Sequence, residues 1–361
     1  MKVVLIMAGG SGERFWPLST REKPKQLLKI FSEKSMIRET VDRVLPIVPK
    51  ENIFISTNIL QWEGIHRELE EIPVDNIIIE PMGRDTASAI GYGAIVIDER
   101  FKGCSIELIV LPADHMIKKE ASFREVLLKG CQEAKENSVI VTLGIKPTRP
   151  ETGYGYIEVK KVKDREELKE GNIYRVKRFR EKPNQEVAET YVNSGNYLWN
   201  SGMFIFSMET IFKNFQVLME DHWDILKDLR EVVKGEVTGE KLSNLAKPYF
   251  EKFEKISIDY GIMEQSKNIR VIPCDIGWSD LGSYNAFSEI YTPDSNGNIT
   301  KGRVVAFESK ENIVIGSDFT ISLLGVDNLV VVKGENNNIL IAKRSRVQDI
   351  KKLLDLYRSM L

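Results

Sequence analysis

Residues 3–29, VVLIMAGGSGERFWPLSTREKPKQLLK, decide the fold of this chain. The apolar run Val3–Met7 predicts a buried strand, and it stops at the glycine-rich turn 9–12. Because glycine has no Cβ, backbone N–H groups in such a turn can approach a phosphate closely and form an anion-binding concavity. Two cations follow, Arg14 and Lys25. We therefore predict a strand that ends in a phosphate-binding turn; a glycine turn that only caps a core strand is the alternative.

Two common nucleotide-binding loops do not fit this turn. A Walker A loop needs Lys-Ser or Lys-Thr directly after its last glycine, whereas Glu13 follows Gly12 here. A dinucleotide-binding fingerprint needs a third glycine where this chain has Phe15. The turn therefore argues against a P-loop NTPase and against an NAD-dependent oxidoreductase.

Length and composition restrict the class of protein. With 361 residues, 42% of them apolar, the chain is long enough for one large α/β domain with a smaller appendage. The net charge of −2, with scattered lysines and arginines, argues against a nucleic-acid partner. No run of about 18 apolar residues indicates a membrane span, and the first residues do not resemble a signal peptide. Three widely separated cysteines are typical of reduced thiols, so we expect a cytoplasmic protein.

Predicted strands and helices alternate through the first 145 residues. This alternation indicates a Rossmann-like, mostly parallel sheet with helices on both faces. In such sheets ligands bind beyond the carboxyl ends of the strands, which points to the loops 8–29, 80–88 and 112–117. The predicted strands after the first are 52–56, 76–80, 106–111 and 139–143, and the predicted helices are 35–44, 62–71, 86–100 and 123–137.

Two of these loops carry candidate binding residues. In the loop 80–88, Gly83 permits close backbone approach, and Arg84 can pair with a phosphate. Asp85 or Thr86 can cap the following helix. Asp114 lies just past a buried strand, where an acidic side chain either coordinates a cation or caps a turn.

The signature at 9–28, GGSGERFWPLSTREKPKQLL, resembles that of the sugar-nucleotide pyrophosphorylases. Its FWPLS and PKQ elements resemble the mannose-1-phosphate guanylyltransferase branch, also called GDP-mannose pyrophosphorylase. The resemblance implies that Lys25 acts on the α-phosphate and that Arg14 and Lys25 are the catalytic cations. The residues expected at the leaving phosphates are Gly9, Gly10, Ser11, Gly12 and Arg14.

The stretch EPMGRDTASAI, 80–90, resembles the base-binding loop of this family. It departs from the family at Asp85 and Ser88, where Asn and Pro are usual. The carboxylate of Asp85 either accepts hydrogen bonds from guanine or caps the helix, so it does not prove guanine selectivity. The nucleotide-binding residues expected here are Glu80, Gly83, Arg84, Asp85 and Thr86.

The resemblance also implies a magnesium ion. The element Pro-x-Asp-His makes Asp114 a Mg²⁺ ligand, and Asp280, between Trp278 and Gly282, is the second. Mg²⁺ suits such a site because it accepts one or two carboxylates together with phosphate oxygens and waters. Capping of a turn is the alternative for Asp280.

The elements TGYG, FREKP and WNSG, at 152–155, 179–183 and 199–202, resemble the sugar-binding half of the family. Sugar hydroxyls need donors and acceptors, and the sugar phosphate needs a cation. A simple ion pair between Glu181 and Lys182 is the alternative. Asp259 and Glu264 are assigned to support of the site. The residues expected to bind the sugar phosphate are Gly153, Tyr154, Gly155, Glu181, Lys182 and Asn200.

The predicted organisation is a nucleotidyltransferase domain, 1–290, followed by a small β-rich domain, 291–361. The first would comprise a nucleotide-binding half, 1–145, and a sugar-phosphate-binding half, 146–290. The β-rich runs, at 304–308, 313–315, 320–324, 329–332 and 339–342, resemble the β-helix-like cap that the family uses in dimer contact, so we expect a homodimer. A terminal helix follows at 347–361. Many bacterial relatives continue into a phosphomannose isomerase domain and this sequence does not, so we expect no isomerase activity.

Together these features predict an enzyme that converts GTP and mannose 1-phosphate into GDP-mannose and pyrophosphate with Mg²⁺. A pyrophosphorylase for another pair, such as glucose 1-phosphate with UTP or dTTP, is the nearest alternative. A non-catalytic regulatory homologue is a second, although the joint presence of Arg14, Lys25, Asp114, Lys182 and Asp280 argues against it.

Overall fold

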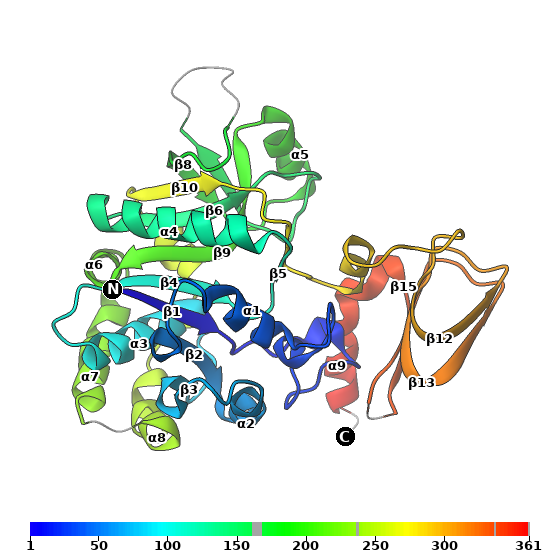
Figure 1. Cartoon of the computed structure of the whole chain (residues 1–361), viewed down its shortest axis with the longest axis horizontal. Coiled ribbons are helices and arrows are strands. Elements are labelled where there is room, and N and C mark those ends of the chain that lie inside the picture. The colour runs from blue at the N-terminus through cyan, green and yellow to red at the C-terminus, as the bar shows by residue number, and fades with distance from the viewer. Residues whose placement is uncertain (161–167, 236–237, 336, 360–361) are drawn as a thin grey trace. The chain divides into compact units, whose positions relative to one another are not determined.

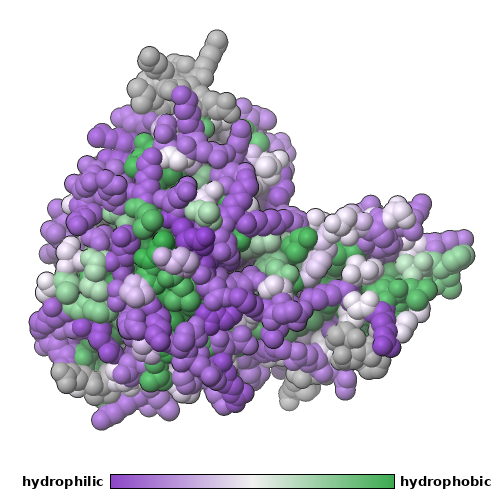
Figure 2. Space-filling view, viewed as in Figure 1, coloured by the Kyte–Doolittle hydropathy of each residue, from purple (hydrophilic) through white to green (hydrophobic). Residues whose placement is uncertain are grey.

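A computed structural model describes residues 1–160, 168–235, 238–335 and 337–359. The chain forms two compact units (Figure 1). Unit 1 comprises residues 1–9, 40–113 and 117–278, and unit 2 comprises residues 10–39, 114–116 and 279–361. The face drawn in Figure 2 is mostly hydrophilic, as expected for a chain in which 29% of residues are charged.

Unit 1 is built on one large mixed sheet. Its four parallel strands β3, β2, β1 and β4 end at the same edge, because Met7 lies beside both Ser56 and Pro112 in the register. Among the described strands of this sheet, β8 and β9 are antiparallel to the others. The order is β3 (Ile77–Glu80), β2 (Ile53–Asn58), β1 (Lys2–Met7), β4 (Glu107–Pro112), β9 (Tyr197–Ser207), β6 (Ile140–Ile145), β10 (Ile269–Pro273), β8 (Tyr174–Arg180) and β7 (Tyr156–Val159).

Helices cover both faces of this sheet. Leu5 faces α3, where a Cβ on Gly93 would lie 2.7 Å from its Cδ2 atom. Ile205 lies on the opposite face, where a Cβ on Gly130 of α4 would overlap its side chain. The helices are α1 (Met36–Val44), α2 (Ile59–Glu68), α3 (Asp85–Arg100), α4 (Glu120–Asn137), α5 (Gln185–Ser194), α6 (Met208–Leu218), α7 (Glu220–Val233) and α8 (Gly239–Phe250).

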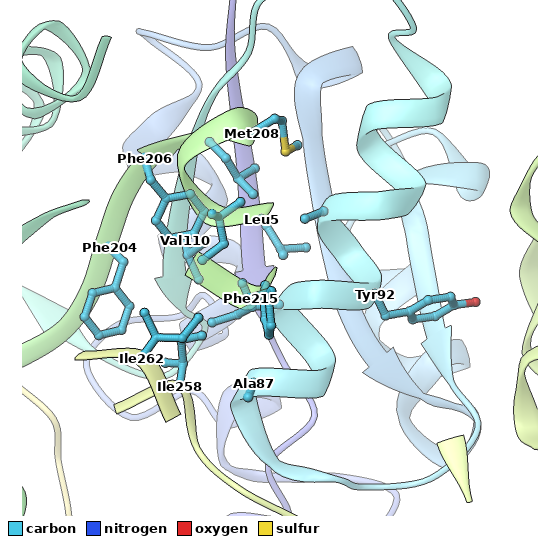
Figure 3. Close-up of a cluster of buried hydrophobic side chains, with 14 of the residues drawn as sticks. Leu5, Ala87, Tyr92, Val110, Phe204, Phe206, Met208, Phe215, Ile258 and Ile262 are labelled. Atoms are coloured by element: carbon cyan, nitrogen blue, oxygen red, sulfur yellow. The ribbon is translucent and has the colours of Figure 1, made fainter. Parts of the chain in front are cut away.

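The main hydrophobic core lies on the α3 face. Figure 3 shows Leu5, Val110 and Phe206 from the sheet directed toward Phe215 of α6, with α3 alongside. These side chains are at most 1% exposed, so each contributes about 1.5–3 kcal/mol of hydrophobic stabilisation.

Local capping sets the ends of several helices. The helix predicted at 62–71 is α2 in the structure and begins earlier, at Ile59. It begins there because the side chain of Asn58 accepts a hydrogen bond from the N–H of Leu60 and caps the helix. In α5 the Asn184 side chain accepts from the N–H of Val187, and Gly195 closes the helix in the left-handed conformation.

Unit 2 joins the glycine-rich signature to the C-terminal part of the chain. The rings of Phe15 and Tyr284 lie 5.2 Å apart, and the Tyr284 hydroxyl donates to the carbonyl of Phe15 at 2.7 Å. Parallel strands β12 (Ile299–Phe307), β13 (Ile313–Leu324) and β14 (Leu329–Lys333) form a sheet with antiparallel β15 (Ile339–Lys343), and α9 (Ile350–Ser359) follows. The predicted strands 313–315 and 320–324 are therefore one strand, β13. Two short strands, β5 (Met116–Ile117) and β11 (Trp278–Ser279), pair with each other.

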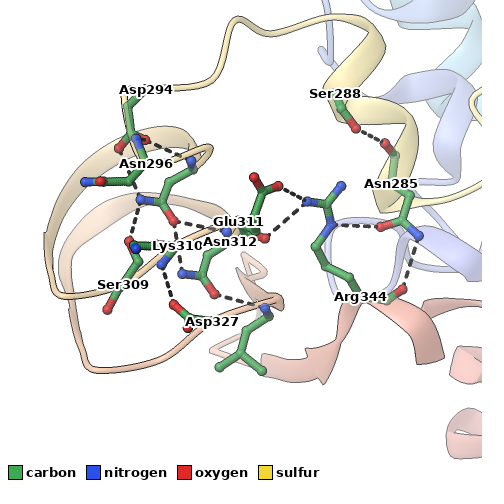
Figure 4. A network of polar contacts seen from close by, with 12 residues as sticks. Asn285, Ser288, Asp294, Asn296, Ser309, Lys310, Glu311, Asn312, Asp327 and Arg344 are labelled. Atoms are coloured by element: carbon green, nitrogen blue, oxygen red, sulfur yellow. Dashed lines mark hydrogen bonds and ion pairs between the residues drawn. The ribbon is translucent and has the colours of Figure 1, made fainter.

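Buried asparagine side chains connect the turns of this C-terminal sheet (Figure 4). Asn312 donates to Asn298 and to the carbonyl of Val326, and it accepts from the N–H of Leu329. Because Asn312 is fully buried, these bonds satisfy groups that would otherwise be costly to remove from water.

The predicted fold class is confirmed: a mixed α/β domain precedes a β-rich C-terminal region with a terminal helix. The helices in the described part of the chain are too short or too polar to cross a bilayer.

Candidate active site

The glycine turn and Lys25 are packed directly against each other in unit 2. Gly12 has φ 60°, and a Cβ there would lie 2.6 Å from both the backbone nitrogen and the Cβ of Lys25. Gln26 donates to the carbonyl of Gly10, and Ser19 donates to that of Gly12. The turn therefore needs glycine at position 12, and it holds Lys25 in place.

Lys25 connects the two predicted metal ligands. Its Nζ atom donates to Asp114 Oδ2 at 2.8 Å and to the main-chain carbonyl of Asp280 at 2.6 Å. The Lys25 side chain is only 5% exposed, whereas that of Asp114 is 35% exposed and accessible to a ligand. Removal from water by itself raises the pKa of Asp114, but the charges of Lys25, His115 and Arg14 outweigh it and hold the pKa below its usual value.

Arg14 and the carboxyl group of Asp280 meet at Gly282. A Cβ on Gly282 would lie 3.0 Å from Asp280 Oδ2 and 3.3 Å from Arg14 Nη1, and the N–H of Gly282 donates to Asp280 Oδ1. Unit 2 therefore brings together the turn, both predicted catalytic cations and both predicted metal ligands. These groups offer cationic and carboxylate chemistry suited to a polyphosphate with its counter-ion.

The donor set fits a magnesium ion better than a transition metal. Asp114 and Asp280 offer hard carboxylate oxygens, and the described residues contain no cluster of three or more histidine, cysteine or acidic side chains that could hold a metal alone. Mg²⁺ normally completes its coordination with phosphate oxygens and waters, so two carboxylates are sufficient.

In unit 1, Glu80 lies at the carboxyl end of β3. It is 7% exposed, and Ser56 from β2 donates to its Oε1 atom at 2.7 Å. Burial raises the pKa of Glu80 to about 7, and the Ser56 hydrogen bond opposes this only in part. Gly9 lies beside this carboxyl group, because a Cβ there would come within 3.5 Å of Oε1. Ser56 was not predicted, since only the parallel pairing of β2 with β3 brings it to Glu80.

The loop that follows Glu80 makes contacts within the protein. Arg84 donates from Nε to the carbonyl of Phe250 and from Nη2 to that of Glu251, so its guanidinium group is directed at main chain. Asp85 has φ 70° and accepts from the N–H of Thr86, whose hydroxyl accepts from the N–H of Ile258. Gly83 has open space around it. The roles of these loop residues in nucleotide binding stay predictions.

The predicted sugar-binding residues also gather in unit 1. Glu181 Oε1 accepts from Lys182 Nζ at 2.8 Å, while Glu181 Oε2 is buried and has no hydrogen-bond partner among the described residues. Gly155 lies against this oxygen, because a Cβ on Gly155 would overlap it. The main-chain N–H of Asn200 donates to the Gly155 carbonyl. The ion pair therefore exists, but it leaves one buried carboxylate oxygen for a ligand.

Aromatic residues next to Gly155 and Asn200 in the chain pack against one another. The ring of Tyr154 lies 5.2 Å from Trp199 and 5.3 Å from Trp278, both edge-on. The N–H of Gly153 donates to Glu151 Oε1 at 3.1 Å. Such rings offer apolar surface for the C–H faces of a sugar.

Comparisons with known proteins show which family the chain belongs to. A family model described as nucleotidyl transferase matches residues 3–296, and one described as MannoseP isomerase/GMP-like beta-helix domain matches residues 302–356. The chain is 33% identical over 357 residues to the mannose-1-phosphate guanylyltransferase of Escherichia coli, covering 98% of this chain and 75% of that protein. It is 36% identical over 355 residues to mannose-1-phosphate guanylyltransferase RfbM of Salmonella typhimurium, and this match covers 97% of this chain and 71% of that protein.

Among solved structures, a protein from Thermus thermophilus described as mannose-1-phosphate geranyltransferase matches with a TM-score of 0.83 at 31% identity. That match covers 99% of both chains. From the extent of these matches, the chain belongs to the nucleotidyl transferase family, in its mannose-1-phosphate guanylyltransferase branch.

Proposed function

We propose that this protein transfers GMP from GTP to α-D-mannose 1-phosphate and releases pyrophosphate. A phosphate oxygen of the sugar attacks the α-phosphorus of GTP in line, the bond between that phosphorus and the α–β bridging oxygen breaks, and GDP-mannose forms. No protein nucleophile takes part, so the enzyme acts by positioning and by neutralising charge. The observation that carries the proposal is the contact of Lys25 Nζ with both Asp114 and Asp280.

The cations of unit 2 take the nucleotide phosphates. The backbone of Gly9, Gly10, Ser11 and Gly12, with Arg14, binds the β- and γ-phosphates that leave. Lys25 binds the α-phosphate and stabilises the charge that develops there. Asp114 and Asp280 would hold Mg²⁺, which when bound supplies further positive charge to the phosphates.

Glu80 provides a basis for selecting guanine. Guanine presents N–H donors at N1 and at its 2-amino group, which the ionised carboxyl group of Glu80 can accept. A buried acceptor left without a donor is costly, so a base that lacks these donors is rejected. Gly9 lies beside this carboxyl group, because a Cβ there would come within 3.5 Å of Glu80 Oε1.

The sugar-binding group of unit 1 takes mannose 1-phosphate. Lys182 binds the phosphate. Burial lowers the pKa of Lys182, but the hydrogen bond that its ammonium group donates to Glu181 and the charge of Glu181 together outweigh this effect and raise the pKa. Glu181 and Asn200 bind hydroxyls, and Tyr154 packs against the sugar, with Gly153 and Gly155 in the loop beside it.

The test is a matrix of substrates with pyrophosphate release as the measurement. We expect release from GTP with mannose 1-phosphate in the presence of Mg²⁺, and much less from ATP, UTP or dTTP or from glucose 1-phosphate. Equal rates with GTP and ATP would refute guanylyl transfer but leave the enzyme class intact. A lack of release with every pair would favour the non-catalytic alternative.

We also propose that two copies of the chain associate through the C-terminal sheet, and that the enzyme works in the cytoplasm. Phe307 and Leu324 lie opposite each other on β12 and β13 and are 61% and 75% exposed; Val305 is 59% exposed. Figure 2 shows hydrophobic surface over these strands. Adjacent exposed apolar side chains of this size are typical of an interface.

A further inference from the structure

Asp259 lies beside the sugar-binding group but has no part in the proposed chemistry. It begins a short π-helix, Asp259–Met263, and its Oδ1 atom accepts a hydrogen bond from Asn200 Nδ2 at 2.9 Å. The other end of the same amide is also used, because Asn200 Oδ1 accepts from the N–H of Gly202 at 3.0 Å. These two bonds set the orientation of the Asn200 amide.

This orientation determines what Asn200 can do for a ligand. One N–H of the amide goes to Asp259, and the second N–H has no partner among the described residues. Glu181 Oε2 and Asn200 both lie against Gly155, since a Cβ on that glycine would overlap Oε2 and come within 3.2 Å of Asn200 Cβ. A sugar hydroxyl can therefore accept from Asn200 and donate to Glu181 Oε2.

The charge of Asp259 matters because Glu181 is close to it. Burial and, to a smaller extent, the charge of Glu181 raise the pKa of Asp259 to about 7, and Asn200 and Lys182 oppose this only in part. Two other acidic groups of the same segment, Tyr260 and Glu264, interact with Lys182 and Glu181. Tyr260 interacts electrostatically with Lys182, and Glu264 Oε1 accepts a hydrogen bond from the N–H of Glu181 at 3.0 Å. Ionised Asp259 would place a second negative charge beside Glu181 and share the charge of Lys182.

We propose that Asp259 is a positioning residue for the sugar phosphate: its neutral acid form orients Asn200 and leaves Glu181 as the single anionic acceptor, and its ionisation weakens binding. The proposal rests on the proposed function, because it concerns the same sugar-binding group. The incoming sugar phosphate is itself an anion, so it binds best when Asp259 carries its proton. The KM for mannose 1-phosphate therefore rises as the pH increases through about 7.

The kinetic test compares the wild-type enzyme with Asp259→Asn. Asparagine keeps an oxygen acceptor for Asn200 but cannot ionise. We expect the KM for mannose 1-phosphate of the wild-type enzyme to rise by up to about tenfold between pH 6.5 and pH 8.5, which corresponds to one unit of pKa change on binding. In Asp259→Asn this rise is absent, while the KM for GTP follows the wild-type profile. Asp275→Asn, which removes a surface carboxylate paired with Lys119, is the matched control and keeps the rise.

A second measurement needs no turnover. In protein with ¹⁵N-labelled asparagine and no substrate, the side-chain amide signals of Asn200, identified by their loss in Asn200→Ala, should titrate with a midpoint near pH 7. The titration should disappear in Asp259→Asn and persist in Asp275→Asn. An Asn200 signal that does not titrate, or that titrates equally in Asp259→Asn, would overturn the inference.

The two proposals fail separately. A wild-type protein that releases no pyrophosphate from any pair refutes the proposed function, and the amide titration still decides how Asp259 acts on Asn200. A wild-type enzyme that turns over with a KM for mannose 1-phosphate that is independent of pH refutes the inference alone.

Discussion

Lys25 is a buried cation whose neighbours make its position specific. The residue is buried, and its ammonium group bonds one carboxylate and one main-chain carbonyl. This suits the role proposed for Lys25, because an ammonium group that is already held in place would need little reorganisation as charge develops on the α-phosphate.

Lys25→Ala should therefore lower kcat by about two orders of magnitude or more, as the loss of a single transition-state contact commonly does. Pyrophosphate release at saturating substrate measures this. Lys23→Ala is the matched control, because Lys23 lies in the same segment but pairs with Glu335 at the surface. Wild-type turnover in Lys25→Ala would remove this lysine from the mechanism.

Glu80 should make GTP binding depend on pH in the opposite sense to Asp259. In the proposed function the ionised carboxylate accepts guanine's N–H groups, and burial raises the pKa of this group to about 7. The KM for GTP should therefore fall as the pH increases from 6 to 8. In Glu80→Gln this dependence should be lost and the KM should be high throughout. A profile of KM for GTP that is the same in both proteins would contradict the assignment.

The same carboxyl group has a defined effect on stability. Its folded-state pKa lies above the ordinary value of 4.5, so the folded protein binds the proton more tightly than the unfolded chain. The stability that Glu80 contributes is complete below about pH 4.5 and declines as the pH rises to about 7. The difference in unfolding midpoint between wild type and Glu80→Gln should change over this window.

At the scale of elements, the turn after β1 depends on one backbone conformation. Gly12→Ala places a Cβ at φ 60° and 2.6 Å from the Lys25 backbone, whereas Gly10 has open space around it. We expect Gly12→Ala to lower the free energy of unfolding by about 1–3 kcal/mol and Gly10→Ala to change it little. Urea denaturation followed by tryptophan fluorescence measures both. Equal midpoints would show that the turn tolerates a side chain at position 12.

The elements also show where pattern reasoning succeeds. Val3–Met7 is a strand and the glycines end it, because an apolar run and a residue without Cβ act locally. Strand direction is not local: β9 runs antiparallel to both β4 and β6, although its apolar sequence is equally compatible with a parallel strand. Only pairing with neighbours decides this.

At the scale of the whole molecule, the exposed apolar pair on the C-terminal sheet bears on assembly. If Phe307 and Leu324 lie at a contact between two copies, Phe307→Asp with Leu324→Asp should convert a dimer to a monomer, because buried unpaired carboxylates are costly. Sedimentation velocity measures the change. Val217→Asp, at a residue that is 69% exposed on α6, is the control. A wild-type monomer at micromolar concentration would refute the dimer.

The sequence by itself determined the α/β class, the glycine-rich turn after the first strand, the family and the β-rich C-terminal region, because these depend on residue type and short spacing. Only the tertiary structure decided that Lys25 contacts Asp114 and Asp280, that Ser56 bonds Glu80, and that Asn200 bonds Asp259. These partners are up to 255 residues apart in the chain. Their contacts arise from strand order and loop closure, and no local pattern encodes those distances.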